Sequence, residues 1–253
     1  AQQQAARRRG ADDLERRLDE ALEQMAEVEK KPKKSRKKRN RSASKDDEPP
    51  SAAEQEALDK KSAHRVSTTD PEARVMKMGD GGFRPAFNGQ FSTDVATQII
   101  VGVDISNVGS DKAEAGSMVD QLEDHYGRLP KKHLVDNGFV RLDIIEDLEG
   151  RGVQVVAPVQ KPRGDRDPFE PLPSDGKGVA AWRKRMGTDE AKEDYPLRAA
   201  VAECVNALAR NRGLTQFPVR GQRKCRAILL WYALAHNLRR ALTLNPHLAL
   251  GAA

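Results

Sequence analysis

Apolar residues are spread unevenly, which divides the chain into a polar N-terminal part and an apolar remainder. Residues 1–70 are almost all polar, and sustained apolar runs begin near Ile99. Within the polar part, five apolar residues recur at alternating intervals of four and three: Leu14, Leu18, Ala21, Met25 and Val28. This spacing predicts an amphipathic helix over residues 1–30. The seam spans only about two heptads, so a short coiled coil and a helix packed on its own chain both stay open.

Two strand patterns come next and predict a hairpin. Residues 87–94 alternate between apolar and polar, and residues 98–105 are rich in β-branched side chains. Their close spacing favours antiparallel pairing. A helix is then predicted over residues 113–126, with Ser110-Asp111 as its N-terminal cap and Gly127 as its end.

The following segments predict a βαβ unit. A strand leads into Asp136, a helix runs through Ile144 and Leu148, and a second strand covers residues 153–158. Such a unit pairs its two strands in parallel. Further helices are predicted at residues 180–186, at the segment that carries Glu203 with Pro196 in its first turn, and at residues 223–242. Together with the hairpin these elements predict a mixed sheet flanked by helices, around one core of about 150 residues.

The charge of the chain favours a polyanionic partner, although ordinary basic surface explains it equally well. The net charge is +6, and residues 30–45 read KKPKKSRKKRNRSASK. That run is either a phosphate-binding arm or a disordered linker, since like charges repel and cannot be buried. A second basic group lies between the last two predicted helices and comprises Arg210, Arg212, Arg220, Arg223, Lys224 and Arg226.

Several classes of protein are excluded or disfavoured by composition. The two cysteines, Cys204 and Cys225, have no metal-binding spacing and form no disulfide framework. The longest apolar stretch, residues 227–235, is too short to span a bilayer, so no membrane partner is expected. Single histidines and tryptophans on predicted helices are interpreted as packing residues, namely His125, His236, Trp182 and Trp231.

Two carboxylates carry the candidate chemistry. Asp136 follows a strand and precedes the strand-breaking pair Asn137-Gly138. Glu203 is the one acid in a helix of small and apolar residues, and it shares a helical face with Asn206 and Arg210. A metal and DNA surface and a solvated helix stripe are both compatible with that face.

Four segments in sequence order resemble the DDE transposases of bacterial insertion sequences: residues 69–74, 83–90, 134–139 and 195–203. The resemblance covers residues 65–242. It implies an α/β fold with an RNase H-like mixed sheet, interrupted by an N-terminal helical and disordered basic insertion. The implied organisation is a helix at 1–30, a basic polar linker at 31–66, a partial RNase H-like domain at 67–243 and a tail at 244–253.

The resemblance also implies an activity and its residues. DNA transposition in this family uses three carboxylates and two Mg²⁺ or Mn²⁺ ions to cut phosphodiesters and transfer strands at the element's ends. Asp136 matches the second acid and Glu203 the third, and these two are the expected catalytic and metal-binding residues. The implied DNA-contacting residues are Tyr195, Arg198, Asn206, Arg210 and Arg212.

The chain departs from the family pattern at two points. Four residues, Ala199 to Ala202, separate Arg198 from Glu203, whereas the pattern is often written with three. A strict alignment therefore puts Ala202 at the acid's position, but Glu203 is preferred as the one acid of that helix. The first acid has no clear match, because Asp70, Asp94 and Asp104 read as turn or strand-end residues.

The first strand and first acid are therefore expected upstream of Ala1. A chain without them is expected to leave a strand edge unpaired and to lack strand-transfer activity on its own. The resemblance implies DNA as partner, both terminal inverted repeats and target, a homodimer in the full-length protein, and a location in the bacterial cytoplasm at the nucleoid. The alternative is a non-catalytic DNA-binding or protein-interaction remnant of a transposase.

Overall fold

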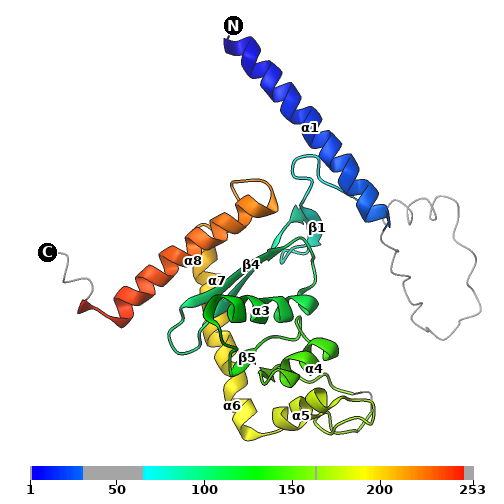
Figure 1. Cartoon of the computed structure of the whole chain (residues 1–253), viewed down its shortest axis with the longest axis vertical. Coiled ribbons are helices and arrows are strands. Elements are labelled where there is room, and N and C mark those ends of the chain that lie inside the picture. Colours follow the sequence, from blue (N-terminus) through cyan, green and yellow to red (C-terminus); the bar gives the residue numbers. More distant parts are fainter. Residues whose placement is uncertain (1, 31–64, 163, 248–253) are drawn as a thin grey trace, which may run out of the picture. The chain divides into compact units, whose positions relative to one another are not determined.

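The computed structural model describes residues 2–30, 65–162 and 164–247 (Figure 1). They fall into two compact units, Ala1–Ala86 and Phe87–Ala253, which are described separately. The predicted basic linker lies almost wholly outside the described residues, as does most of the tail. The predicted domain bounds stay predictions. None of the helices in the described part of the chain is long and apolar enough to cross a membrane.

The first unit consists of a long helix and a short hairpin. Helix α1 spans Gln2–Lys30, and strands β1 (Arg74–Lys77) and β2 (Phe83–Ala86) pair antiparallel. Gln24 of α1 accepts a hydrogen bond from Arg74, and Ala21 is buried. The other large residues of the α1 seam are exposed, namely Leu14, Leu18 and Met25.

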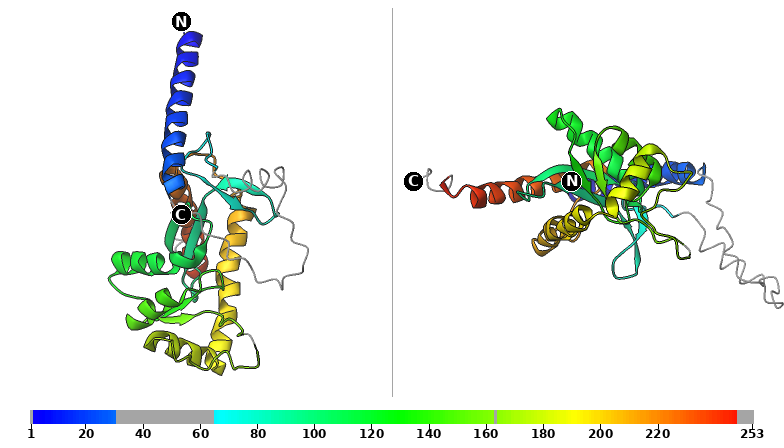
Figure 2. Two further views of the ribbon diagram at one scale, coloured as in Figure 1. Left: turned by 90° about the vertical axis from the view of Figure 1, so that its right-hand side faces the viewer. Right: turned by 90° about the horizontal axis from the view of Figure 1, so that it is seen from below.

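The second unit is built around the predicted hairpin. Strands β3 (Asn88–Thr93) and β4 (Ile100–Ser106) pair antiparallel, with Gln90 opposite Asp104. Helix α3 (Glu114–Tyr126) packs on one face of the hairpin and helix α8 (Gln222–Leu244) on the other (Figures 1 and 2). Glycines permit both approaches. A Cβ at Gly102 would lie 2.6 Å from Met118 Sδ of α3, and one at Gly89 would lie 3.0 Å from Leu229 Cδ1 of α8.

The predicted βαβ unit is also present. Strands β5 (Lys132–Leu134) and β6 (Gln154–Val156) pair in parallel, connected by helix α4 (Leu142–Gly150). Helix α5 (Lys177–Met186) packs against α4, and Trp182 is buried in the core between them. The sequence therefore predicted the packing of Trp182 correctly. The predictions for Trp231 and His125 are wrong, since Trp231 of α8 is 69% exposed and His125 of α3 is exposed as well, whereas His236 is buried as predicted.

The hairpin and the parallel pair do not join into the single mixed sheet that the sequence predicts. The described strands form three separate two-stranded sheets, and no described strand lies between β3 and β5 to connect them. The core is divided in the same way. One group of buried side chains surrounds β5, β6, α4 and α5, and a second lies between the hairpin, α7 (Cys204–Asn211) and α8.

The outer edge of β4 is closed by side chains instead of a strand. Gln121 of α3 accepts from Val103 N at 2.9 Å and donates to Val103 O at 3.1 Å. Asn237 of α8 pairs with Ile100 in the same way, with both bonds at 2.8 Å. Each amide thus satisfies one backbone donor and one backbone acceptor, as a neighbouring strand would.

The segment around Pro196 differs from its prediction. Helix α6 spans Asp189–Arg198, so Pro196 lies inside the helix and not in its first turn. Thr188 caps this helix by accepting a hydrogen bond from Ala191 N. A π-helical turn, η2 (Ala199–Glu203), follows directly and leads into α7. Proline has no N–H, so α6 lacks the helical hydrogen bond that residue 196 would otherwise donate.

Replacing Gln121 by Leu is expected to destabilise the second unit. The substitution leaves the N–H and C=O of buried Val103 without their partners, and we expect a loss of about 1–3 kcal/mol in the free energy of unfolding. Urea unfolding followed by circular dichroism measures it. Gln160→Leu, at an exposed loop position, is the control. Equal stability of the two variants would contradict the role assigned to Gln121.

Candidate functional site

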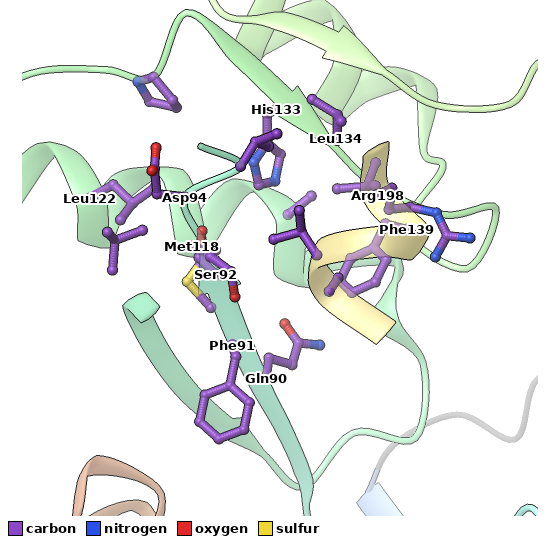
Figure 3. Close-up of a pocket in the computed structure, with 18 of the residues that line it drawn as sticks. Gln90, Phe91, Ser92, Asp94, Met118, Leu122, His133, Leu134, Phe139 and Arg198 are labelled. Atoms are coloured by element: carbon purple, nitrogen blue, oxygen red, sulfur yellow. The ribbon is translucent and has the colours of Figure 1, made fainter. Parts of the chain in front are cut away.

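A cleft of about 1010 Å³ lies between β3 and β5 in the second unit. Residues 88–95 line one side and residues 128–136 the other, and α3 and the segment around Arg198 complete the walls. Figure 3 shows Gln90 and Ser92 of β3 opposite His133 and Leu134 of β5, with Met118 and Leu122 of α3 along one wall. The cleft therefore lies where the two small sheets fail to meet.

Within the part of the chain that the structure describes, both strands that border the cleft have an edge without a strand partner. On β4, the backbone groups of Val103 face away from β3, because they bond to Gln121. By alternation, its opposite residue Phe91 directs its own backbone groups away from β4. On β5, Lys131 O accepts a hydrogen bond from Gln154 N, and Val135 N donates one to Val156 O. Alternate residues of this segment therefore direct their backbone groups toward β6. Lys132 and Leu134 then present their backbone groups on the opposite edge.

Asp136 lies at the cleft, two residues beyond the end of β5. Its Oδ1 accepts a hydrogen bond from Gly138 N at 2.7 Å, which fixes the carboxylate in a tight turn. A Cβ at position 138 would be only 2.9 Å from that oxygen, so a larger residue there would displace the carboxylate of Asp136 from this position. The pair Asn137-Gly138 thus does more than end the strand, because Gly138 also holds the acid in place.

Asp111 is a cleft residue that the sequence interpretation missed. The sequence predicts Ser110-Asp111 as a helix cap, but Ser110 makes no side-chain cap and Asp111 begins a 3₁₀ turn, η1 (Asp111–Ala113). Its Oδ1 accepts hydrogen bonds from the side-chain amides of Asn88 and Gln90, and its Oδ2 lies 3.4 Å from the Cβ position of residue 138. The signal available in the sequence was the pair of amide residues Asn88 and Gln90, which occupy alternate positions of one strand and can both donate to a carboxylate.

Arg198 and Glu203 meet across the π-helical turn. Arg198 Nη2 lies 3.1 Å from Glu203 Oε1, and the Arg198 guanidinium lies 5.5 Å from the ring centre of Tyr195. Residues five apart point in different directions on an α-helix, whereas the i to i+5 geometry of a π turn brings them to one side. Within the described residues, the buried Nε of Arg198 has no hydrogen-bond partner.

The other predicted residues are divided between the cleft and the surface. Asn206 lines the cleft, whereas Tyr195 does not and packs against the core around β5 and β6. Arg210 and Arg212 are exposed outside it, and Arg210 donates to the carbonyl of Asn206. The alternative acids serve local turns. Asp94 accepts from Thr97, and Asp70 accepts through its carbonyl from Ala73 N.

Comparison with known protein families shows to which family the chain belongs. The model of the family described as "Transposase DDE domain" matches residues 53–238, which is more than two thirds of the chain. The chain belongs to the transposase DDE domain family. Comparisons with curated proteins and with solved structures gave no significant match. Membership of this family implies that the DDE domain is a polynucleotidyl transferase that acts on DNA in transposition.

Transposases of this family generally use divalent metal ions. Carboxylate oxygens are suitable ligands for Mg²⁺ or Mn²⁺. Asp136, Asp111 and Glu203 all line the cleft. However, no three His, Cys, Asp or Glu side chains converge as metal ligands do within residues 2–30, 65–162 and 164–247. The donors have the right chemistry but do not make a complete site.

Basic side chains also border the cleft of the DDE domain. Arg128 and Lys131 are exposed, while Lys132 is tied to α6 through Asp194 at 2.6 Å and Glu190 at 2.7 Å. These two bonds, chiefly that from Asp194, raise the pKa of Lys132. Lys132 therefore acts as a link between β5 and α6, whereas Arg128 and Lys131 remain accessible to an anionic ligand.

His133 lies on β5 at the cleft and is uncharged at neutral pH. Burial lowers the pKa of its imidazole from 6.5 to about 4. Between pH 4 and 6.5, His133 of the unfolded chain has its ordinary pKa and therefore binds a proton more readily than His133 of the folded DDE domain. The free energy of unfolding should therefore be largest above pH 6.5 and fall as the pH decreases toward 4.

We expect His133→Gln to weaken this acid sensitivity. One proton gives a slope of at most about 1.4 kcal/mol per pH unit, and the variant should lose that share of the slope. The measurement is the urea unfolding free energy at several pH values from 7 to 4, with His125→Gln at an exposed position of α3 as control. Identical pH profiles for the wild type and His133→Gln would refute the assignment.

Proposed function

We propose that this chain is the catalytic part of an insertion-sequence transposase, which cuts DNA at the element's ends and joins those ends to a target. The observation that carries the proposal is the shared cleft, which Asp136 and Glu203 both line next to Arg198. In this proposal Asp136 supplies the second acid and Glu203 the third, as the resemblance to the family implies.

Asp136 and Glu203 would hold Mg²⁺ or Mn²⁺. When bound, two such ions would activate the attacking hydroxyl and stabilise the leaving oxygen of an in-line phosphodiester displacement. The fixed turn at Gly138 supports Asp136 in this role, because the carboxylate needs little reorganisation to bind a cation. Asp111 lies beside the same turn, where its charge would add to the attraction for a cation.

Glu203, and not Ala202, takes the role of the third acid. The π-helical turn supports this assignment, because it places Glu203 beside Arg198 although four residues separate them. In the proposal Arg198 contacts a DNA phosphate. Its stacking on Tyr195 supports that role, since a guanidinium held by a ring keeps its donors oriented.

A further strand completes an RNase H-like sheet. It would lie between β3 and β5, supplied from outside the described residues, and would carry the missing first acid. The support is the pair of open strand edges that border the cleft, because an inserted strand would satisfy the backbone groups of both. The hairpin, the inserted strand and the parallel pair would then form one mixed sheet.

DNA would lie along the cleft in contact with Arg128, Lys131 and Arg198, and with Asn206 of α7. Arg210 and Arg212 are outside the cleft and would contact the backbone of flanking DNA. The proposal includes terminal inverted repeats and target DNA as ligands, a homodimer as the full-length assembly, and action at the bacterial nucleoid.

The first test is metal binding by the 253-residue chain. We expect Mn²⁺ to bind weakly and Asp136→Ala and Glu203→Ala each to reduce the affinity at least about tenfold, since each removes a charged oxygen ligand. Electron paramagnetic resonance of free Mn²⁺ gives the affinity. The controls are Asp124→Ala and Glu193→Ala, which remove exposed helical carboxylates away from the cleft. Unchanged affinity in both cleft variants would reject the site.

The second test concerns the inserted strand. We expect the 253-residue chain alone to show no cleavage of end-specific DNA in Mg²⁺, because the cleft as the described residues form it lacks the further strand and the first acid that the proposal requires. A chain extended by the upstream reading frame should cleave, and its Asp136→Ala variant should not. Cleavage by the unextended chain, measured on labelled DNA ends in a gel assay, would contradict the need for another strand.

A further inference from the structure

The C-terminal end of the chain carries positive charge and no negative charge. Residues 204–253 contain eight Arg or Lys residues and no Asp or Glu, although the whole chain is nearly balanced, with 44 basic and 38 acidic residues. In the described part of the chain this segment forms α7, α8 and the loop that joins them (Figure 1). None of these elements contains an acid that could neutralise its cations.

The loop between α7 and α8 turns its apolar residues inward and its basic residues outward. Phe217 and Val219 pack against the core between the hairpin, α7 and α8. The thiol of buried Cys225 bonds Val219 O at 3.7 Å, which ties the end of the loop to the first turn of α8. Arg212 and Arg220, at the two ends of the loop, are exposed. The inward packing therefore holds these guanidinium groups in solvent.

Five exposed basic side chains surround this loop, and we call them the α7–α8 basic surface: Arg210, Arg212, Arg220, Arg223 and Lys224. Arg212 lies beside the hydroxyl of Tyr232, where its charge opposes the rise in the pKa of Tyr232 that burial causes. Arg223 is nine residues from Tyr232 on α8, so the surface extends over about 13 Å. That length equals the rise of about four phosphates on one DNA strand.

The start of α8 is fixed near the cleft but outside it. Gln222 donates a hydrogen bond to Ile105 O at 2.8 Å, and Ile105 is paired with Gly89 of β3. The next residue of β3, Gln90, donates to Asp111 in the cleft. The start of α8 and Asp111 are therefore at the same end of the hairpin. The five described residues of the α7–α8 basic surface do not line the cleft.

The cleft itself is a poor site for a polyanion in the absence of metal. Six carboxylates line it against four basic side chains, and one of the four, Lys132, is already paired with Asp194 and Glu190. A phosphate backbone that enters such a cleft without metal meets an excess of negative charge, which opposes binding. The α7–α8 basic surface has the opposite charge balance.

We propose that the α7–α8 basic surface is a second DNA site, which binds the phosphate backbone of duplex DNA without metal and without regard to base sequence. The inference assigns Arg220, Arg223 and Lys224 to this site together with Arg210 and Arg212. Cations that contact phosphates release the counterions condensed on DNA, and this release drives binding. DNA held there lies next to the cleft before metal neutralises the acids of the cleft.

This inference rests on the proposed function in taking DNA as the polyanion, but it uses none of the acids in the cleft. Failure of the Mn²⁺-binding and cleavage tests would leave the second site standing. Failure of the second site would leave the assignments of Asp136 and Glu203 unchanged.

The test is the fluorescence anisotropy of a short labelled DNA duplex, titrated with the 253-residue chain in EDTA at several KCl concentrations. We expect the wild type to bind, and the combined variant Arg220→Gln, Arg223→Gln and Lys224→Gln to raise the Kd at least about tenfold. The slope of log Kd against log [KCl] should fall by about 2 to 3, because each phosphate contact contributes about 0.9.

Two controls separate this site from total charge and from folding. The combined variant Lys161→Gln, Lys177→Gln and Lys184→Gln removes the same charge at exposed positions on and near α5, and should keep the Kd within about threefold of the wild type. Arg220→Lys with Arg223→Lys keeps the charge and should bind equally well, since phosphate contacts require charge and carry no sequence information. The basic residues 30–45 are unchanged in every variant.

Four outcomes would overturn the proposal. They are a wild type that does not bind the duplex in EDTA, an equal loss of affinity in the two triple variants, and a loss of affinity in the lysine-for-arginine variant. The fourth is a difference of more than about tenfold between two duplexes of unrelated sequence, because contacts to the backbone do not distinguish bases.

Discussion

Backbone hydrogen bonding at the edges of the β3–β4 hairpin determines where the second unit is closed and where it is open. Gln121 and Asn237 satisfy the outer edge of β4 with amide groups from two different helices. This leaves the inner edge of β3 as the side on which the hairpin can accept another strand. The cleft, the separation of the two cores and the placement of the acids all follow from that asymmetry.

The acids that border the cleft are each held by a different device. Asp136 is fixed by the backbone of Gly138, Asp111 by the amides of Asn88 and Gln90, and Glu203 by Arg198. The donors to Asp136 and Asp111 are neutral and leave the carboxylate charges unneutralised, whereas the donor to Glu203 is the cationic guanidinium of Arg198. Glu203 is also the more exposed acid, with 62% of its side chain accessible. The β5 side of the cleft is therefore the more rigid and the α7 side the more adjustable.

Sequence reasoning predicted the elements whose pattern is local. The β3–β4 hairpin, the parallel β5–β6 pair and the end of α3 at Gly127 follow from alternation, β-branched runs and a glycine with φ of +64°. It failed where the outcome depends on contacts between distant segments. Asp111 becomes a cleft residue only because β3 brings two amides to it. Trp231 is exposed because the opposite face of α8 is the one anchored to β4, and that choice lies in the hydrogen bonds of Asn237.

The π-helical turn at Ala199–Glu203 shows why a motif defined by residue count can mislead. A fixed-spacing alignment would read Ala202 as the functional position and classify the helix as having lost its acid. One additional residue is instead absorbed by a single wide turn, while Val205 and Ala209 beyond it keep their buried positions. In this chain the side on which Glu203 lies is set by the helical register, and not by the number of intervening residues. A change of one residue in length can therefore leave the geometry of an arginine and its acid intact.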